Sequence, residues 1–337
     1  MVKTCYLHLG FHKTATTSFQ LTLQHNRKLL KQGGIFLPKF EGKQKKFSSN
    51  HSGQIRDIFD ENAQLFWNSH NRFKPTTDKH SNSLHNHCHS LKQLLEQDQN
   101  ILISGEGIST MSEKSLSRLK SKLEQHGFLI EPFALVRSPY AYITSALQQT
   151  IKNGKYHPWI SLIPAQSSAS HEFVKIPKST KSIRVLNRVF GKKINYIPFK
   201  KATNYPGGPV LFLLQEVLRL QDSDQYKLIN ANESKSNVST RLQNFLNQQH
   251  THADQRKLKN LLTTISGQSE QAKFLLTKQE FDGIKDDFKR IKREMKQKLG
   301  KQFVEETITF SSEFSAAETN QLLSQLSQKL YEFAMEK

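Results

Sequence analysis

A glycine, a lysine and several hydroxyl residues follow directly after the first apolar run of the chain. The run Cys5–Leu9 leads into Gly-Phe-His-Lys-Thr-Ala-Thr-Thr-Ser at positions 10 to 18, where a helical pattern begins. A junction between a strand end and a helix start binds anions, because free backbone N–H groups and the helix dipole point toward it. Lys13 adds a mobile positive charge. The loop is therefore predicted to hold a phosphate group, with hydroxyl donors at Thr16, Thr17 and Ser18.

The loop differs from the usual loop of nucleoside-triphosphate enzymes, which reads G-x-x-x-x-G-K-[ST]. Here the lysine comes early, and Ala15-Thr16-Thr17 stands where the final Gly-Lys-Thr would be. The lysine that accompanies the Mg²⁺ site of an ATPase is therefore missing from its usual place. A P-loop kinase or NTPase stays the alternative interpretation, and magnesium-dependent ATP turnover would support it.

A second candidate phosphate site follows the apolar run Ile130–Val136. Arg137 stands at the end of this run, Ser138 is a good N-cap and Pro139 suits the first position of a helix. Ser145 then lies about two turns into that helix. An arginine fork matches phosphate oxygens and a serine adds one more donor. This segment is therefore predicted to bind a second phosphate.

Together, the two segments resemble the sulfotransferases that use 3′-phosphoadenosine-5′-phosphosulfate (PAPS). LGFHKTATTS is similar to the family's 5′-phosphosulfate loop, usually close to K-[TS]-G-T-T, and RSPYAYITS is similar to its 3′-phosphate signature, R-x-P-x-x-x-x-x-S. QQTIKNG, FGKKINYIPF and NESKSNVS also resemble segments of bacterial members. The C-terminal motif of the cytosolic small-molecule branch, R-K-G-x-x-G-D-W-K, is not found, so the likeness is to the carbohydrate-directed or bacterial branch.

The resemblance implies an activity and roles for particular residues. It implies transfer of the sulfuryl group from PAPS to an acceptor hydroxyl, on a saccharide or glycoconjugate, with PAP as the product and no metal required. Lys13 would bind the 5′-phosphate and the bridging oxygen, and Arg137 and Ser145 would bind the 3′-phosphate. Ala15 replaces the commoner glycine, which restricts a positive φ at that point. The implied cofactor-binding loop positions are Gly10, His12, Lys13, Thr14, Ala15, Thr16, Thr17 and Ser18.

Sulfuryl transfer also needs a base that takes the proton of the acceptor. Family members carry this base, a histidine or glutamate, just beyond a strand edge, and Glu106 in ILISGEGIST stands at such a place. His51 in SSNHSGQI resembles an Asn-His-Ser stretch of some bacterial members and is the second candidate. Each has a structural interpretation as well, because Glu106 could cap the next helix and His51 could start one. At this point the choice stays open.

Short apolar runs alternate with helical patterns, which predicts a parallel sheet covered on both faces. The expected fold is a three-layer αβα domain of the P-loop-like kind, with the motifs at the carboxyl edge of the sheet and a helix-rich part from about residue 209. One domain is expected over residues 1–337. The predicted strands are Cys5–Leu9, Gly34–Leu37, Ile101–Ser104, Ile130–Val136 and Ile194–Pro198, and the predicted helices are Thr16–Lys31, Ile55–Trp67, Leu84–Glu96, Ser112–His126, Pro139–Lys152 and Thr180–Phe190.

The charge of the chain indicates an anionic partner. Lys and Arg outnumber Asp and Glu by 49 to 29, giving a net charge of +20, which suits a phosphorylated cofactor or an acidic saccharide. The sequence has no RRM-, KH- or zinc-finger-like pattern that would predict nucleic-acid binding. It also has no apolar run of about 18 residues that would predict a membrane span. The chain starts without a signal-peptide pattern and has two cysteines, so a cytoplasmic location is expected.

A histidine-rich segment raises the question of a metal site. HSNSLHNHCHS brings four histidines and a cysteine close together, and imidazole and thiolate are good zinc ligands. However, no second ligand cluster at finger-like spacing follows. A solvated insert or helix start is the favoured interpretation of His80, His85, His87, Cys88 and His89.

Overall fold

The structure is a computed structural model that describes residues 2–40, 48–63, 77–168, 179–221, 223–231, 236–249 and 273–311, with a few single positions near the C-terminus. The chain forms two compact units. The first comprises Met1–Arg137 and Lys178–Asn232, and the second comprises Ser138–Pro177 and Glu233–Lys337. Each unit therefore contains an early and a late part of the chain, and the single domain expected from the sequence stays a prediction.

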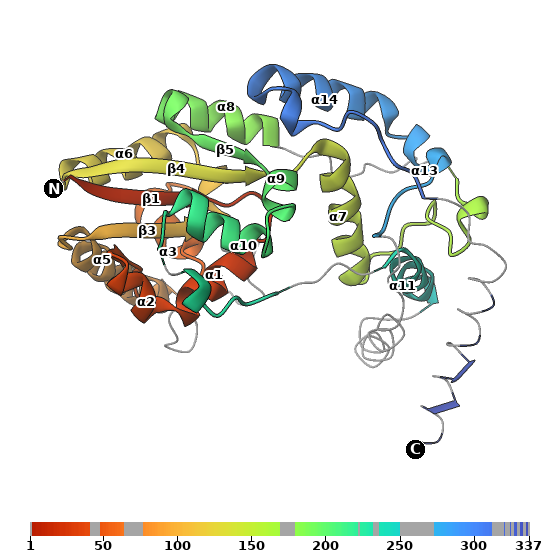
Figure 1. The fold of residues 1–337 in the computed structure, drawn as a ribbon, viewed down its shortest axis with the longest axis horizontal. Helices are drawn as coiled ribbons and strands as arrows, with labels where there is room; N and C mark the ends of the chain where they lie inside the picture. The colour runs from red at the N-terminus through yellow and green to blue at the C-terminus, as the bar shows by residue number, and fades with distance from the viewer. Residues whose placement is uncertain are drawn as a thin grey trace. The chain divides into compact units, whose positions relative to one another are not determined.

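The first unit is built on a parallel sheet, which has five strands within the described residues (Figure 1). Their spatial order is β2-β3-β1-β4-β5, so β1 lies between β3 and β4. His8 of β1 pairs with Ser104 of β3 on one side and with Phe133 of β4 on the other. All paired strands run parallel, so their carboxyl ends share one edge of the sheet. The strands are β1 (Lys3–Leu9), β2 (Ile35–Phe36), β3 (Asn100–Gly105), β4 (Phe128–Val136) and β5 (Asn195–Pro198).

Helices cover both faces of this sheet, so the unit has the three-layer αβα fold expected from the sequence. One layer packs on a core that includes Phe19, Phe133 and Leu214, and α6 packs against β4 and α8 in the other layer. The first layer contains α1 (Thr16–His25), α2 (Arg27–Gln32), α9 (Phe199–Thr203), α10 (Gly208–Phe212) and the π-helical turn η5 (Leu213–Val217); the second contains α3 (Ser52–Phe59), α5 (Thr77–Leu95), α6 (Glu113–Gln125) and α8 (Ser179–Phe190).

All five predicted strands are confirmed, with ends that differ by at most two residues. The prediction of one helix over Thr16–Lys31 is wrong, because the chain breaks at Asn26 into α1 and α2. The Asn26 side chain donates to the carbonyl oxygens of Thr22 and Lys227 and accepts from the N–H of Lys227. The break thus allows Asn26 to bind the backbone of Lys227, which is 201 residues away in the sequence.

The predicted helix Ile55–Trp67 is also too long. In the structure α3 begins at Ser52 and ends at Phe59, and residues 64–67 lie outside the described residues. The carboxylate of Asp60 interacts with the Arg56 guanidinium and accepts the N–H of Asn62 at 3.1 Å. A side chain that binds the backbone two residues further on favours a turn over a helix.

The second unit is mainly helical, as expected for the later part of the chain. Its apolar core joins Tyr140, Trp159, Phe274, Phe281 and Phe288 with neighbouring aliphatic residues. The helices of this unit are α7 (Pro139–Lys152), α11 (Asn237–Gln249), α13 (Lys278–Asp282) and α14 (Lys285–Leu299). Shorter 3₁₀ turns in the chain are η2 (Ile108–Thr110), η3 (Pro164–Gln166), η4 (Gly191–Lys193), η6 (Ser223–Gln225) and η7 (Lys301–Phe303).

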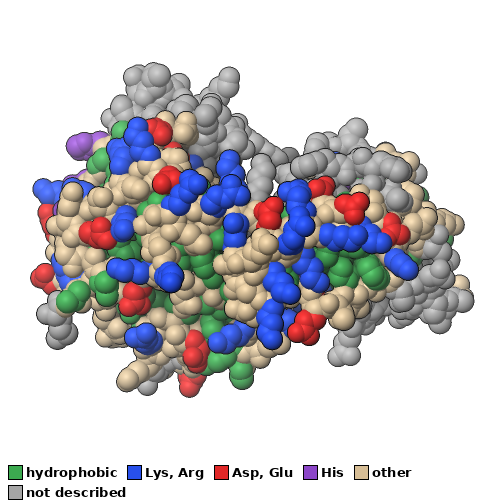
Figure 2. Space-filling model, turned by 90° about the horizontal axis from the view of Figure 1, so that it is seen from above, with side chains coloured by type: hydrophobic (Ala, Val, Ile, Leu, Met, Phe, Trp, Pro, Cys, Tyr) green, Lys and Arg blue, Asp and Glu red, His purple; other side chains and the backbone are tan. Residues whose placement is uncertain are grey.

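Helix α14 has one apolar face and one charged face. Phe288, Ile291 and Met295 are buried, whereas Lys and Arg side chains gather over its outer face (Figure 2). Exposed ion pairs join Arg290 to Asp287 at 2.9 Å and to Glu294 at 3.8 Å. This helix is therefore a packed element with a solvated basic face. Within the described residues, no helix is long and apolar enough to cross a membrane.

A fully buried ion pair joins distant segments of the second unit. Arg241 on α11 donates to both carboxylate oxygens of Glu280, at 2.7 and 3.0 Å, and neither side chain is exposed. The same guanidinium also donates to the carbonyl oxygens of Ser161 and Leu275. Glu280 in turn accepts the N–H of Thr277 at the start of α13. Every hydrogen-bonding group of this pair is thus used within one network.

We expect Arg241→Met to destabilise the protein by about 3–5 kcal/mol, because it leaves the Glu280 carboxylate buried without its partner. Urea unfolding followed by circular dichroism measures this free energy. Arg290→Met is the matched control, since it breaks only exposed ion pairs on α14 and should change the unfolding free energy by less than about 1 kcal/mol. Equal losses in the two variants would contradict this account of the buried pair.

Candidate functional site

The loop between β1 and α1 has an unusual backbone. Lys13 and Ala15 both have positive φ, 67° and 58°, although non-glycine residues rarely adopt this conformation. Turns that include left-handed residues direct successive N–H groups into one concavity that suits an anion. The alanine in place of the commoner glycine does not prevent this backbone, but it makes it strained.

The hydroxyl residues of the loop differ in what they contact. Thr14 is buried and donates to the carbonyl oxygen of Phe11 at 2.7 Å. Its hydroxyl oxygen lies 3.4 Å from that of Thr16, which is also buried. Thr17 is exposed. In this structure Thr14 and Thr16 therefore stabilise the loop from within, and Thr17 is the threonine that faces solvent.

Ser18 holds another part of the chain. Its hydroxyl donates to the carbonyl oxygen of Ala231 at 3.1 Å and accepts the N–H of Ala231 at 3.0 Å. One turn further along α1, Thr22 accepts the N–H of Ile229 at 2.9 Å. Together with the Asn26 bonds, these contacts attach the segment 227–231 along α1, antiparallel to it. The NESKSNVS segment that follows lies in part, at 232–235, outside the described residues.

Glu106 packs directly on the loop between β1 and α1. The N–H of Gly10 donates to the carbonyl oxygen of Gly105 at 3.3 Å, and the Ser109 hydroxyl lies 2.9 Å from the carbonyl oxygens of both Gly10 and Glu106. A Cβ atom on Gly10 would lie only 3.1 Å from the Cα of Glu106 and 3.0 Å from the side chain of Thr16. The glycine at position 10 is therefore required by the close approach of the ends of β1 and β3.

The Glu106 carboxylate faces the loop that contains Lys13. Its Oε2 lies 3.4 Å from Nδ1 of His12, and the two side chains are 28% and 54% exposed. An open carboxylate beside the loop can be reached by an acceptor hydroxyl. The structure thus brings together two of the residues that the sequence singled out, His12 and Glu106.

His51 lies in a different environment. It is fully buried beside Phe40, and its Nδ1 accepts the N–H of Ser104 at 3.2 Å. Burial lowers the pKa of His51 to about 3, with the positive charge of Arg27 as a smaller cause. A neutral imidazole without access to solvent cannot take a proton from an acceptor in this conformation. Of the two candidate bases, the geometry favours Glu106.

Arg137 follows β4, the direct neighbour of β1. Because the two strands are parallel, their loops leave the same edge of the sheet. The guanidinium lies over the ring of Phe199, with 4.6 Å between its central carbon and the ring centroid. Desolvation lowers the pKa of Arg137 to about 10, so the side chain is still a cation at neutral pH. A partly desolvated guanidinium at this edge is suited to an anion.

The helix after Arg137 is α7 of the second unit, and its first turn is capped in a way that the sequence did not predict. Ser138 stands at the N-cap position but its side chain makes no capping hydrogen bond. Instead, Oε1 of Glu305 accepts the N–H groups of Tyr140 and Ala141 at 2.8 and 3.1 Å. Ser145 lies half-buried in this helix. The capping carboxylate comes from a residue far away in the sequence, so no sequence pattern near α7 indicated it.

The histidine-rich segment forms part of α5. His87 is buried, with Nδ1 2.9 Å from a carboxylate oxygen of Asp57, whereas Cys88 is exposed. The side chain of His80 lies outside the described residues. Among the residues that the structure describes, no group of three or more His, Cys, Asp or Glu side chains is arranged to hold a metal ion.

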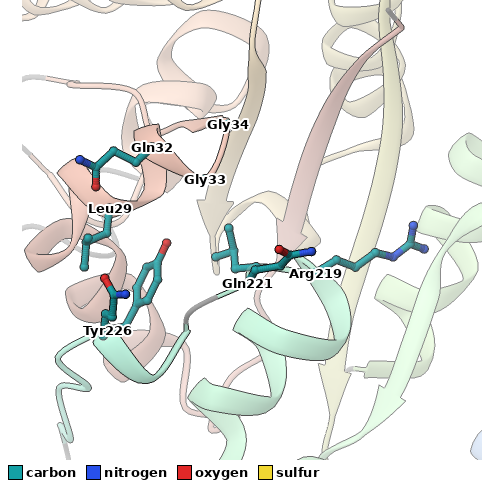
Figure 3. A pocket seen from close by; sticks show the side chains of 9 residues that line it. Leu29, Gln32, Gly33, Gly34, Arg219, Gln221 and Tyr226 are labelled. Atoms are coloured by element: carbon teal, nitrogen blue, oxygen red, sulfur yellow. The ribbon is translucent and has the colours of Figure 1, made fainter.

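A pocket of about 580 Å³ lies away from the loop between β1 and α1 (Figure 3). Its glycines, Gly33 and Gly34, precede β2, whose first residue pairs with the first residue of β3. The pocket is thus at the amino edge of the sheet, opposite to the edge from which the phosphate loop leaves. Figure 3 shows the Arg219 side chain extending away from the other lining residues. None of the predicted site residues lines it; the lining is Leu29, Gln32, Gly33, Gly34, Arg219, Leu220, Gln221, Gln225 and Tyr226.

Comparison with known protein families found no family whose model matches this chain. Comparison with curated proteins found no match either.

We expect Ala15→Gly to stabilise the protein by about 1 kcal/mol, because glycine adopts a positive φ without the strain that a Cβ atom causes. Thermal unfolding measures the change. Ala202→Gly is the matched control, since Ala202 is a buried helical residue of the same unit and should lose stability by a similar amount. A lower melting temperature for Ala15→Gly would show that the backbone at position 15 is not left-handed in solution.

Proposed function

We propose that the protein transfers the sulfuryl group of PAPS to an acceptor hydroxyl on a saccharide or glycoconjugate. The observation that carries this proposal is the placement of Lys13 and Arg137 after neighbouring parallel strands, at one edge of the sheet. Two cations after adjacent strands suit a ligand with two separate phosphates. The open carboxylate of Glu106 beside the same loop supplies a candidate base.

The loop fits the phosphate end of such a nucleotide. The left-handed residues at 13 and 15 give the backbone of an anion nest. Bound PAPS would supply the sulfuryl group and a phosphate as the leaving group. Lys13 would neutralise the charge that develops on that phosphate, and Arg137 would hold the 3′-phosphate.

The reaction is an in-line displacement at sulfur. A bond forms between the acceptor oxygen and sulfur while the bond from sulfur to the bridging oxygen breaks. The bonding electrons leave with PAP, whose charge Lys13 stabilises, and the acceptor proton passes to the Glu106 carboxylate. Lys13 thus acts where negative charge develops on the leaving phosphate, and Glu106 acts where the acceptor loses its proton.

The overall charge of +20 would help to attract both an anionic nucleotide and an acidic saccharide. The nucleotide alone accounts for much of this need, so the identity of the acceptor has to come from experiment. Incubation with labelled PAPS and a panel of glycans, lipids and phenols would show which compound becomes labelled. Labelling of a lipid or phenol instead of a glycan would contradict the saccharide part of the proposal.

We expect Lys13→Ala and Arg137→Ala each to lose most of their affinity for PAP, because each variant lacks one of two charge-assisted contacts to phosphate. Glu106→Gln should keep the affinity for PAP and lose turnover, because an amide cannot accept the proton. Isothermal titration with PAP tests the binding, and transfer of label to the acceptor found in the panel tests the turnover.

Lys31→Ala is the matched control for the charge changes, since Lys31 is an exposed residue at the end of α2. Its titration with PAP should be like that of the unchanged protein. A normal titration for Arg137→Ala would contradict the second phosphate contact, and magnesium-dependent ATP turnover by the unchanged protein would replace the proposal with a kinase or NTPase.

A further inference from the structure

Two side chains of α3 bind the peptide group that follows Glu106. The Ser52 hydroxyl oxygen accepts the N–H of Gly107 at 2.7 Å. From one turn further along the same helix, Arg56 donates to the carbonyl oxygen of Gly107 through Nε at 3.0 Å and through a terminal nitrogen at 2.7 Å. Both backbone polar groups of Gly107 are therefore held by one helix.

The two side chains that make these bonds are themselves fixed. Arg56 is 6% exposed. Its other terminal nitrogen contacts the Asp60 carboxylate, and the terminal nitrogen that binds Gly107 also donates to the Thr110 hydroxyl. Ser52 is 4% exposed and donates its hydroxyl proton to the side-chain oxygen of Asn50 at 2.6 Å. Because Ser52 and Arg56 are both buried and partnered, these two side chains have little freedom to move.

Glycines on both sides explain why Glu106 needs such support. Gly105 and Gly107 would let the backbone of Glu106 take many conformations if nothing held it. A Cβ atom on Gly105 would lie 2.8 Å from the Ser52 hydroxyl oxygen, so the glycine allows α3 to approach closely. The close approach of α3 thus requires a glycine at position 105, and the same approach fixes the backbone after Glu106.

We propose that Ser52 and Arg56 are positioning residues that hold Glu106 against the phosphate loop, where its carboxylate meets the acceptor. This inference rests on the proposed function. Neither side chain has to touch the substrates. They act through Gly107, and Ser109 supports the same segment through the carbonyl oxygen of Glu106. Misplacement of a reacting group by about 1 Å lowers a reaction rate by roughly 100-fold.

Two conservative variants test this role. Arg56→Lys keeps a positive charge near Asp60 but cannot make the forked bond to Gly107. Ser52→Ala removes the acceptor for the Gly107 N–H and the donor to Asn50. We expect each to lower kcat by roughly tenfold to 100-fold. The KM for PAPS and the dissociation constant for PAP should change by less than about twofold, because Lys13 and Arg137 are not altered.

Two control variants separate positioning from general loss of stability. Arg241→Lys alters another buried arginine, which donates to the carbonyl oxygens of Ser161 and Leu275. Ser167→Ala removes another buried hydroxyl, which accepts the N–H of Ser161 and donates to Glu280. Neither contacts Gly107. The controls should lose as much thermal stability as the test variants and keep kcat. If Arg56→Lys does not fold, the comparison of Ser52→Ala with Ser167→Ala decides.

The outcomes are distinct. A fall in kcat confined to the test variants supports the inference. Test variants as active as their controls would overturn it while leaving the sulfuryl transfer in place. An unchanged protein that neither binds PAP nor transfers label would overturn the proposed function, and the inference with it.

Discussion

The close approach of the ends of β1 and β3 is the constraint on which the candidate site depends. Gly10 has no room for a side chain because Glu106 lies against it, and Gly105 has none because the Ser52 hydroxyl lies there. This packing brings the loop between β1 and α1, the Glu106 carboxylate and the start of α3 close together at the carboxyl edge of the sheet. A small outward shift of any of them would open the contact between His12 and Glu106.

The positions of the positively charged side chains follow from the same sheet geometry. Parallel strands place their carboxyl ends at one edge, so the loop after β1 and the residue after β4 lie near each other without any long excursion of the chain. Arg137 is partly desolvated against Phe199, which strengthens its interaction with an anion compared with a guanidinium in water. By contrast, the buried histidines His8 and His51 have their pKa lowered to about 3, so they add no positive charge beneath the loop.

The sequence predicts those parts of the fold that depend on local pattern. The strands β1, β3 and β4 contain clear apolar runs, and the helix Pro139–Lys152 has the expected bounds because a proline opens it. The features that were missed all depend on distant partners. Asn26 breaks a helix to bind Lys227, and Glu305 caps α7 in place of Ser138. In the sequence Arg56 is an ordinary helical residue, and the structure shows that its guanidinium donates to the carbonyl oxygen of Gly107.

The candidate site shows the same division. Their places after apolar strands and the resemblance to a sulfotransferase family singled out Lys13, Glu106 and Arg137. The sequence put Glu106 before His51 but left the choice open, because their difference in burial arises from how α3 packs on β3. Nor could it show that the Ser18 hydroxyl binds Ala231. Such assignments need the neighbours that only folding supplies.

The most direct test of the central claim is to titrate the unchanged protein with PAP and with adenosine 5′-phosphate in the same calorimeter. The two ligands differ only in the 3′-phosphate. Two cationic contacts on separate phosphates predict that PAP binds at least roughly tenfold more tightly, since one charge-assisted contact contributes about 1.5–3 kcal/mol. Equal affinities, or no binding of PAP at all, would contradict the account.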